Sequence, residues 1–155
     1  MIQNRREFVK VSGVLGLMAA AGLITMKEAR AQQQAWNKAA FDTKTVEDTI
    51  KALGGSATAP SGDISITAPD IAENGAVVPV AVTSKIPNTQ GIYVLVEKNP
   101  NTLAAGFTIP AGTEPSVSTR IKMGQTSNVH AVVKADNKFY VATKEVKVTL
   151  GGCGG

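Results

Sequence analysis

NVHAVVKADNKFYVATKEVKVTL, the sequence from Asn128 to Leu150, alternates apolar and polar side chains on both sides of the dipeptide Asp136-Asn137. A period of two residues indicates β-strands with one buried face, and Asp-Asn is a plausible turn for a two-residue hairpin. The apolar rows are Val129, Ala131 and Val133 before the turn, then Phe139 and Val141, and then Val146, Val148 and Leu150. We therefore expect antiparallel strands joined by a tight turn, with these rows facing a core.

The same period of two extends back along the chain to Asp63, with turn signals such as Glu73-Asn74-Gly75 between the runs. The apolar rows there are Ile64 and Ile66; Val78, Val80 and Val82; Ile92, Val94 and Val96; Ala105, Phe107 and Ile109; and Val117 and Ile121. About seven short strands at this spacing predict an all-β fold, an immunoglobulin-like antiparallel sandwich over residues 63–150. The strand with Pro79 is expected at a sheet edge or at a bulge, because proline cannot donate to a ladder.

Residues 32–62 predict a short helical lead and a linker ahead of the sandwich. Gln32 to Phe41 has the pattern of a short amphipathic helix, and Thr45 begins a second helix that Gly54-Gly55 ends. The residues after Gly55, rich in Pro, Gly, Ser and Ala, are expected to form the link. The predicted strand around Tyr93 is apolar on both faces, so its second face is covered either by the helical lead or by another subunit.

Residues 1–31 have the three parts of an export signal. A charged start with Arg5 and Arg6 precedes an apolar stretch diluted by small and polar residues, and Ala29-Arg30-Ala31 offers a small-x-small cleavage site. The paired arginines favour a twin-arginine signal, cleaved after Ala31, over an ordinary secretory signal or an uncleaved anchor. We expect the mature protein in the periplasm. Because that route exports folded proteins, a partner bound in the cytoplasm is the expected reason for its use.

The composition argues against several classes of protein. The 155-residue chain has a net charge of +4, but residues 1–31 hold five of its 16 basic and two of its 12 acidic residues. The remainder carries 11 basic and 10 acidic groups, a balance of +1 that offers no footprint for nucleic acid. One cysteine and one histidine exclude an intramolecular disulfide framework and a multi-ligand Cys/His metal site. Because no phosphate loop or haem motif is present either, we expect no cofactor.

The chain ends with Gly151-Gly152-Cys153-Gly154-Gly155, directly after the last predicted strand. Four glycines give residues 151–155 little conformational preference, so we expect a flexible, thin arm that can enter a narrow pocket on another protein. Only a minority of an unperturbed thiol is ionised near neutrality, and the arm has no His, Lys or Arg to stabilise a thiolate. This pattern favours a passive carrier that holds a substrate on Cys153 over an enzyme with its own catalytic residues. His130 is expected to face the solvent or an interface.

Other roles for the terminal cysteine also deserve consideration. An odd cysteine in an exported protein often pairs between chains, so Cys153 is also a candidate for a disulfide between subunits of an immunoglobulin-like binding module. A terminal Gly-Gly also occurs on ubiquitin-like sulfur carriers, which are activated with ATP in the cytoplasm. The export signal and the all-strand body argue against that class.

The leader, the strand-rich body and the terminal pentapeptide together resemble the SoxY family of periplasmic thiosulfate oxidation. The similarity extends along most of the chain, and the terminal Gly-Gly-Cys-Gly-Gly is its most specific part. Further segments that carry it are 69–80 (PDIAENGAVVPV), 96–101 (VEKNPN), 118–125 (STRIKMGQ) and 146–150 (VKVTL).

The resemblance implies a set of partners and a reaction. SoxY proteins pair with SoxZ, which has no signal of its own, and this pairing would explain export in the folded state. The haem enzyme SoxAX joins thiosulfate to the carrier cysteine, SoxB releases sulfate, and SoxCD, where present, oxidises the remaining sulfur. By position, Cys153 is the attachment site and the four glycines are the swinging arm. A related carrier that serves another periplasmic oxidation, such as one linked to quinoprotein dehydrogenases, stays an alternative.

Overall fold

β8 (Ser127–Ala135) and β9 (Lys138–Val148) form the hairpin that the alternating pattern predicts. Its turn residues Asp136 and Asn137 have φ angles of 48° and 60°, the positive values that a type I′ hairpin turn requires. The computed structural model describes residues 37–150, and every structural statement below concerns that range. The predicted export signal of residues 1–31 lies outside it.

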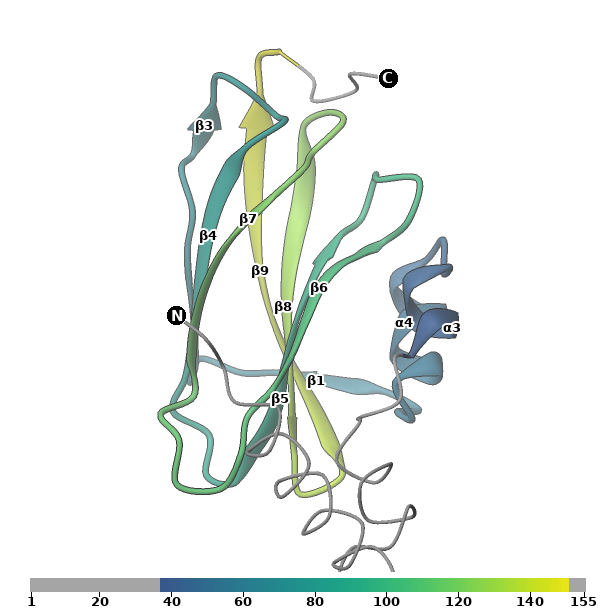
Figure 1. Cartoon of the computed structure of the whole chain (residues 1–155), viewed down its shortest axis with the longest axis vertical. Helices are drawn as coiled ribbons and strands as arrows, with labels where there is room; N and C mark the ends of the chain where they lie inside the picture. Colours follow the sequence, from purple (N-terminus) through teal and green to yellow (C-terminus); the bar gives the residue numbers. More distant parts are fainter. Residues whose placement is uncertain (1–36, 151–155) are drawn as a thin grey trace, which may run out of the picture. The chain divides into compact units, whose positions relative to one another are not determined.

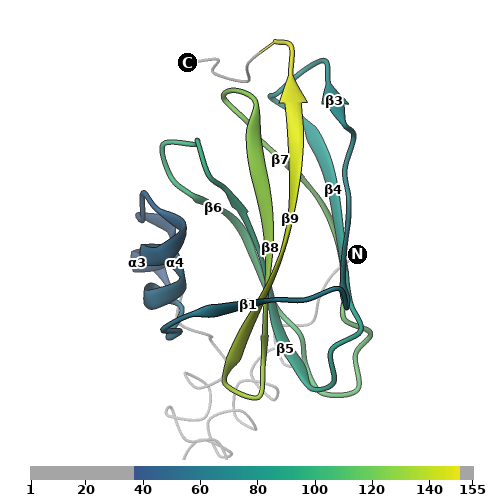
Figure 2. The ribbon, with the colours of Figure 1, turned by 180° about the vertical axis from the view of Figure 1, so that it is seen from behind.

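The strands form two sheets that face each other as a sandwich (Figures 1 and 2). The larger sheet has the order β1-β9-β8-β5-β6, with β3 also paired to β9, and the smaller sheet has the order β2-β4-β7. The remaining elements are α3 (Lys38–Phe41), α4 (Val46–Ala52), β1 (Thr58–Pro60), β2 (Ile64–Thr67), β3 (Ile71–Ala72), β4 (Val78–Ser84), β5 (Thr89–Val96), β6 (Leu103–Thr108) and β7 (Ser116–Ile121). The predicted all-β sandwich is confirmed. The short strands β1 and β3, which run parallel to β9, are additions to the expected set.

The main core lies between the two sheets and uses the predicted apolar rows. Its fully or almost fully buried side chains include Val78, Val80, Val82, Ile92, Val94, Val96, Val129, Ala131, Val133 and Val146. Each valine or isoleucine among them contributes about 1.5–3 kcal/mol by its removal from water. The rows therefore fix which face of each strand points inward.

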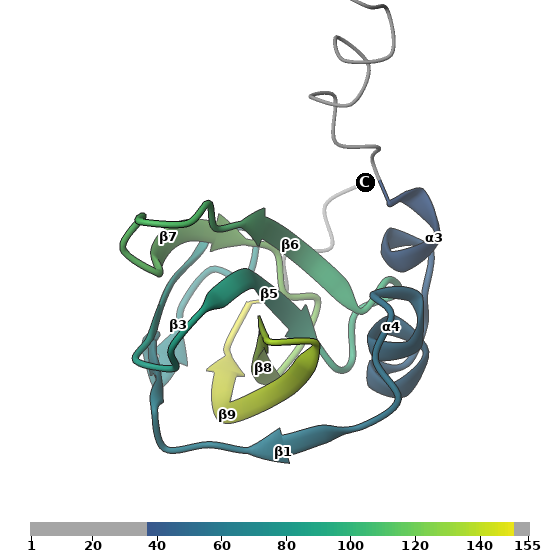
Figure 3. The same cartoon turned by 90° about the horizontal axis from the view of Figure 1, so that it is seen from below.

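The second face of the larger sheet is covered by the helical lead. α3 and α4 lie on the side of this sheet opposite the β2-β4-β7 sheet (Figures 1 and 3), and together with Leu95, Val132 and Phe139 they form a second apolar cluster. Of the two covers expected for the strand around Tyr93, the structure thus shows the helical one. Thr45 caps α4 as predicted, since its Oγ1 accepts a hydrogen bond from the Asp48 amide at 3.1 Å. Within residues 37–150, neither helix has the length and apolarity needed to cross a bilayer.

Tyr93 lies across two glycines on this second face. A Cβ added at Gly91 would lie 2.9 Å from the Tyr93 Oη, and one added at Gly106, directly across the ladder, would lie 3.1 Å from Cδ1. The two glycines therefore leave the space in which the aromatic ring packs against the sheet. This burial raises the pKa of the Tyr93 hydroxyl.

The expected edge position of the Pro79 strand is wrong for the strand as a whole. β4 lies in the middle of its sheet, between β2 and β7. Pairing with β2, however, reaches only from Ser84 to Ala81, whereas Pro79 pairs with Arg120 of β7. Pro79 therefore lies beyond the end of β2, where one side of β4 has no ladder to disrupt.

Gly55 provides a test of how closely the helical lead packs. A Cβ at this position would lie 2.8 Å from both Ile50 Cγ2 and Phe139 Cδ2, so the Phe139 ring would have to move. We expect Gly55→Ala to lower the free energy of unfolding by about 1–3 kcal/mol. Gly62→Ala is the matched control, because nothing lies within 4 Å of its added Cβ, and its effect should stay within about 0.5 kcal/mol. Urea unfolding measures both, and equal stabilities of the two variants would contradict the close contact.

Candidate functional site

The site residues expected from sequence lie near the two ends of the chain, outside the described residues. They are Arg5, Arg6 and the cleavage position Ala31 at one end, and Cys153 with Gly151, Gly152, Gly154 and Gly155 at the other. The structure does describe the chain up to Leu150, where the C-terminal arm (residues 151–155) begins. The candidate functional site is therefore the arm root, which we define as the end of β9 and the loops beside it (Figure 1).

The end of β9 is held by hydrogen bonds on both sides. On one side, β8 pairs with β9 as far as Val146, and Thr126 Oγ1 then accepts a hydrogen bond from the Val148 amide at 2.9 Å. On the other side, β3 pairs with β9, and the Thr149 amide donates to the Ala72 carbonyl at 3.1 Å. The backbone that leads into the arm is thus fixed in position up to Thr149.

Gly75 fixes the last described residue. Its amide donates to the Leu150 carbonyl at 2.8 Å, and its own carbonyl accepts from the amide of the fully buried Met123 at 2.7 Å. The preceding Asn74 shapes the turn, because its Oδ1 accepts from the Ala76 amide at 2.9 Å. The turn signal in this part of the sequence therefore has a second role, which the sequence pattern did not reveal: it positions the origin of the arm.

The alternation predicts that Leu150 continues the buried row of β9, but it does not. Val146 is buried and Val148 is half-buried, but Leu150 is 68% exposed. β8 begins at Ser127, which lies opposite Val146, so no β8 residue faces Leu150 across the ladder. The apolar alternation thus extends beyond the end of the sandwich.

His130 lies well away from the arm root. It faces Thr143 across the β8–β9 ladder, and its Nδ1 is 2.9 Å from the Thr143 Oγ1. Its side chain is only 15% exposed, so it is more covered than the expected solvent- or interface-facing histidine. From Thr143 to Leu150 the chain extends roughly 20 Å, whereas the residues from Leu150 to Cys153 reach about 10 Å. His130 is therefore too distant to act as a base for Cys153 of the same chain.

Glu97 connects the end of β5 with β8 on the same face as His130. Its Oε2 accepts a hydrogen bond from Asn128 Nδ2 at 2.9 Å and lies 3.6 Å from His130 Nε2. The Asn128 hydrogen bond has the largest effect and lowers the pKa of the Glu97 carboxyl. Desolvation, the next largest, opposes it, and interactions with His130 and Lys98 lower the pKa further. The folded state therefore favours the ionised carboxylate.

One charged side chain near the arm root, that of Lys144, acts as a structural tie. Lys144 Nζ lies 3.0 Å from Asp70 Oδ1 and donates to the Ala68 carbonyl at 2.6 Å, which connects β9 with the segment before β3. Lys147 has an exposed side chain. Among residues 37–150, no three His, Cys, Asp or Glu side chains gather in a way that would hold a metal ion.

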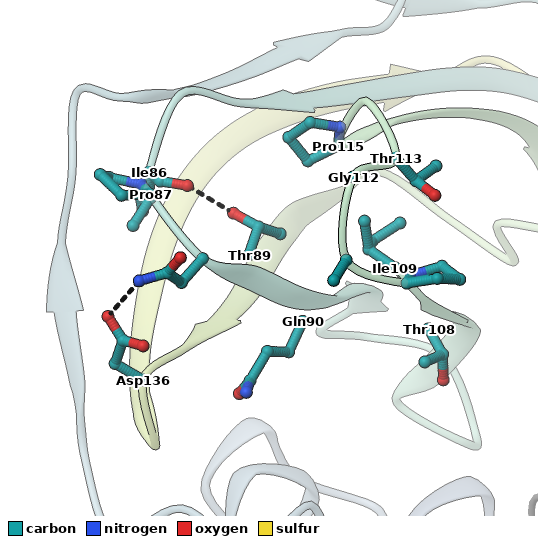
Figure 4. Close-up of a pocket in the computed structure, with 13 residues that line it drawn as sticks. Ile86, Pro87, Thr89, Gln90, Thr108, Ile109, Gly112, Thr113, Pro115 and Asp136 are labelled. Atoms are coloured by element: carbon teal, nitrogen blue, oxygen red, sulfur yellow. Dashed lines mark hydrogen bonds between the residues drawn. The ribbon is translucent and has the colours of Figure 1, made fainter.

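An open pocket lies at the end of the sandwich away from the arm root (Figure 4). The β4–β5 turn, the β6–β7 loop and Asp136 line it. Thr89 Oγ1 donates to the Ile86 carbonyl at 2.8 Å within the β4–β5 turn, and Asn88 Nδ2 donates to Asp136 Oδ2 at 3.2 Å, which ties this turn to the β8–β9 turn. Because β9 runs from this end to the arm root, the pocket is not within reach of Cys153 of the same chain.

The Glu97 interactions predict a pH-dependent stability. A carboxyl whose pKa is lowered on folding stabilises the folded state above its unfolded-state pKa, and this contribution disappears as the pH falls through its folded-state pKa. Glu97→Gln should therefore destabilise the protein slightly at neutral pH and leave it equal to wild type at strongly acidic pH. The effect is small because the side chain is 47% exposed.

Urea unfolding at neutral and at acidic pH measures this difference. Glu114→Gln, at an exposed carboxylate on the β6–β7 loop, controls for the loss of one negative charge. A Glu97→Gln deficit that has the same size at both pH values would rule out the proposed ionisation effect.

Comparison with known proteins finds a family and a solved structure that resemble this chain. The family model described as sulfur oxidation protein SoxY matches residues 50–153. The solved structure of the sulfur carrier protein SoxY from Chlorobium limicola f thiosulfatophilum is 40% identical, covers 74% of this chain and 100% of its own, and superposes with a TM-score of 0.63.

Two other comparisons add no information about function. A Jonesia denitrificans lytic polysaccharide monooxygenase is 13% identical, covers 60% of this chain and 58% of its own, and has a TM-score of only 0.34. None of the curated proteins matches. From the family model and the Chlorobium structure, the chain belongs to the SoxY family of sulfur oxidation proteins.

Proposed function

We propose that this protein is a sulfur carrier, which holds thiosulfate-derived intermediates on Cys153 and presents them to separate enzymes. The observation that carries the proposal is the extent of the family match, which continues past the sandwich to residue 153 and so includes the cysteine. The Chlorobium relative, itself named a sulfur carrier protein, supports it. The hydrogen-bonded arm root supports it as well, because a tethered substrate is presented reproducibly only from a fixed origin.

In this proposal, Cys153 is the attachment point and other proteins supply the catalytic groups. Joining the Cys153 thiolate to thiosulfate forms one S–S bond and gives Cys153–S–S–SO3⁻. The step releases two electrons, which a haem enzyme of the SoxAX type accepts. Hydrolysis by a SoxB-type enzyme then adds one water, releases sulfate and two protons, and leaves the persulfide Cys153–S–S⁻. A SoxCD-type dehydrogenase, where present, oxidises the remaining sulfur.

The proposed location is the periplasm, reached by the twin-arginine route. Arg5 and Arg6 ahead of a weak apolar segment support this route, and Ala29-Arg30-Ala31 supports cleavage after Ala31. We propose a SoxZ-like subunit as the partner in a heterodimer. A subunit without a signal of its own would be exported together with this chain, which accounts for export in the folded state.

The intact mass of the protein isolated from the periplasm of cells grown on thiosulfate tests the proposal. We expect a chain that begins at Gln32 and carries a reductant-labile adduct of about 112 Da for bound thiosulfate or about 32 Da for each sulfane sulfur. Cys153→Ser should lose every adduct and keep the wild-type unfolding midpoint, because the sandwich core lies outside the arm. A bare thiol, or only a Cys153–Cys153 dimer, would favour the disulfide-linked module instead.

A separate experiment tests whether enzymatic loading of Cys153 requires a thin arm. Replacing Gly152 and Gly154 with valine should slow enzymatic loading of Cys153 by about tenfold or more, because branched side chains stiffen the backbone and widen the arm. The reaction of the same thiol with a small alkylating reagent should change far less. Alanine at both positions, which adds only a methyl group, is the intermediate control. Equal slowing of both reactions by valine would show that the width of the arm is unimportant.

A further inference from the structure

Three large apolar side chains are strongly exposed in the described part of the chain, and all three lie at the arm root. Leu150 is 68% exposed, Ile71 is 58% exposed and Val77 is 52% exposed. Other apolar side chains of this size within residues 37–150 are buried or half-buried. Exposed aliphatic residues that gather at one place indicate an interaction surface more often than exposed residues that are scattered singly.

Backbone hydrogen bonds hold these three residues in one neighbourhood. Ile71 lies opposite Lys147 in the β3–β9 ladder, three residues before Leu150. The amide of Gly75 binds the Leu150 carbonyl, and the Val77 amide donates to the Asn74 carbonyl in the same turn. Figures 1 and 2 show β3, the β3–β4 turn and the end of β9 side by side at the end of the sandwich from which the arm leaves. We call Ile71, Val77 and Leu150 the apolar collar.

The length of the arm determines what must approach the collar. From Leu150 to Cys153 the chain reaches about 10 Å when fully extended. Any enzyme that acts on a group bound to Cys153 must therefore bring its active-site entrance to within about that distance of Leu150. Surface around Leu150 then faces the rim of that entrance whenever the arm is inserted.

We propose that the apolar collar docks against an apolar rim around the active-site entrance of the enzymes that process Cys153. The inference rests on the proposed carrier function and specifies the surface that those enzymes recognise. Exposed polar groups next to the collar include Glu73 and Lys147. They give the carrier's docking surface a polar border around an apolar centre, as is common in protein interfaces. Three side chains make a small contact, which suits a carrier that has to dissociate after each step.

Kinetics of loading test the docking role of the collar. In complex with its SoxZ-like subunit, the carrier is titrated as substrate of the SoxAX-type haem enzyme with thiosulfate. We expect Ile71→Gln and Val77→Gln each to lower kcat/KM by about tenfold through a higher KM, with kcat unchanged, because the interaction acts before the chemical step. Alkylation of Cys153 by a small reagent should keep its wild-type rate.

Thr108→Gln is the matched control, because Thr108 is an exposed residue at the end of β6 that lies away from the arm root. This variant should leave kcat/KM unchanged. Wild-type unfolding midpoints for all three variants exclude a folding defect. An unchanged kcat/KM in both collar variants, while the wild type loads normally, would overturn the docking role of the collar and leave the carrier function standing. Loss of the heterodimer in the collar variants would also overturn it and would assign the surface to the SoxZ-like subunit. A wild-type complex that takes up no sulfur would instead overturn the carrier function itself.

Discussion

The position of Leu150 depends on the hydrogen bonds that hold the end of β9 on both sides. Thr126 and β8 hold one edge, and β3 with Gly75 holds the other. Without these contacts, the last residues of the strand would fray, as chain termini commonly do. The point at which the arm starts would then move with the strand end. Because the strand end is fixed, residues 151–155 start from a defined point at Leu150.

The two apolar faces of the larger sheet explain why the protein has a third layer. Val94 and Val133 face the other sheet, whereas Leu95 and Val132 face the opposite way and are just as fully buried. A two-layer sandwich would leave the second pair in water. α3 and α4 provide the missing cover, and they do so beside the sheet rather than at its end (Figure 3). The two helices therefore do not cover the end of the sandwich that holds the arm root.

The sequence predicts the elements whose signals are local and repeated. Alternation placed the rows of β4, β5 and β8 on the correct face, and the capping threonine placed the start of α4. β1 and β3 were missed because strands of three and two residues contain too little alternation to detect. The exposure of Leu150 was missed because alternation does not reveal where the neighbouring strand begins. The role of Gly75 depends on a contact between residues 75 positions apart, which no single-sequence pattern encodes.

A carrier that serves several enzymes faces a conflict between recognition and release. Tight binding to one enzyme would delay transfer to the next, because differences in affinity appear mostly in the dissociation rate. In the proposed function, a tether separates the two requirements: the arm enters the active site, and only a small surface at its root contacts the enzyme. Insertion of the arm also makes the collar contact effectively intramolecular, so that weak apolar contacts suffice once the thiol is bound. In the same proposal, chemistry that changes the group on Cys153 removes the fit of that group to the first active site, and the weak collar contact alone does not retain the carrier.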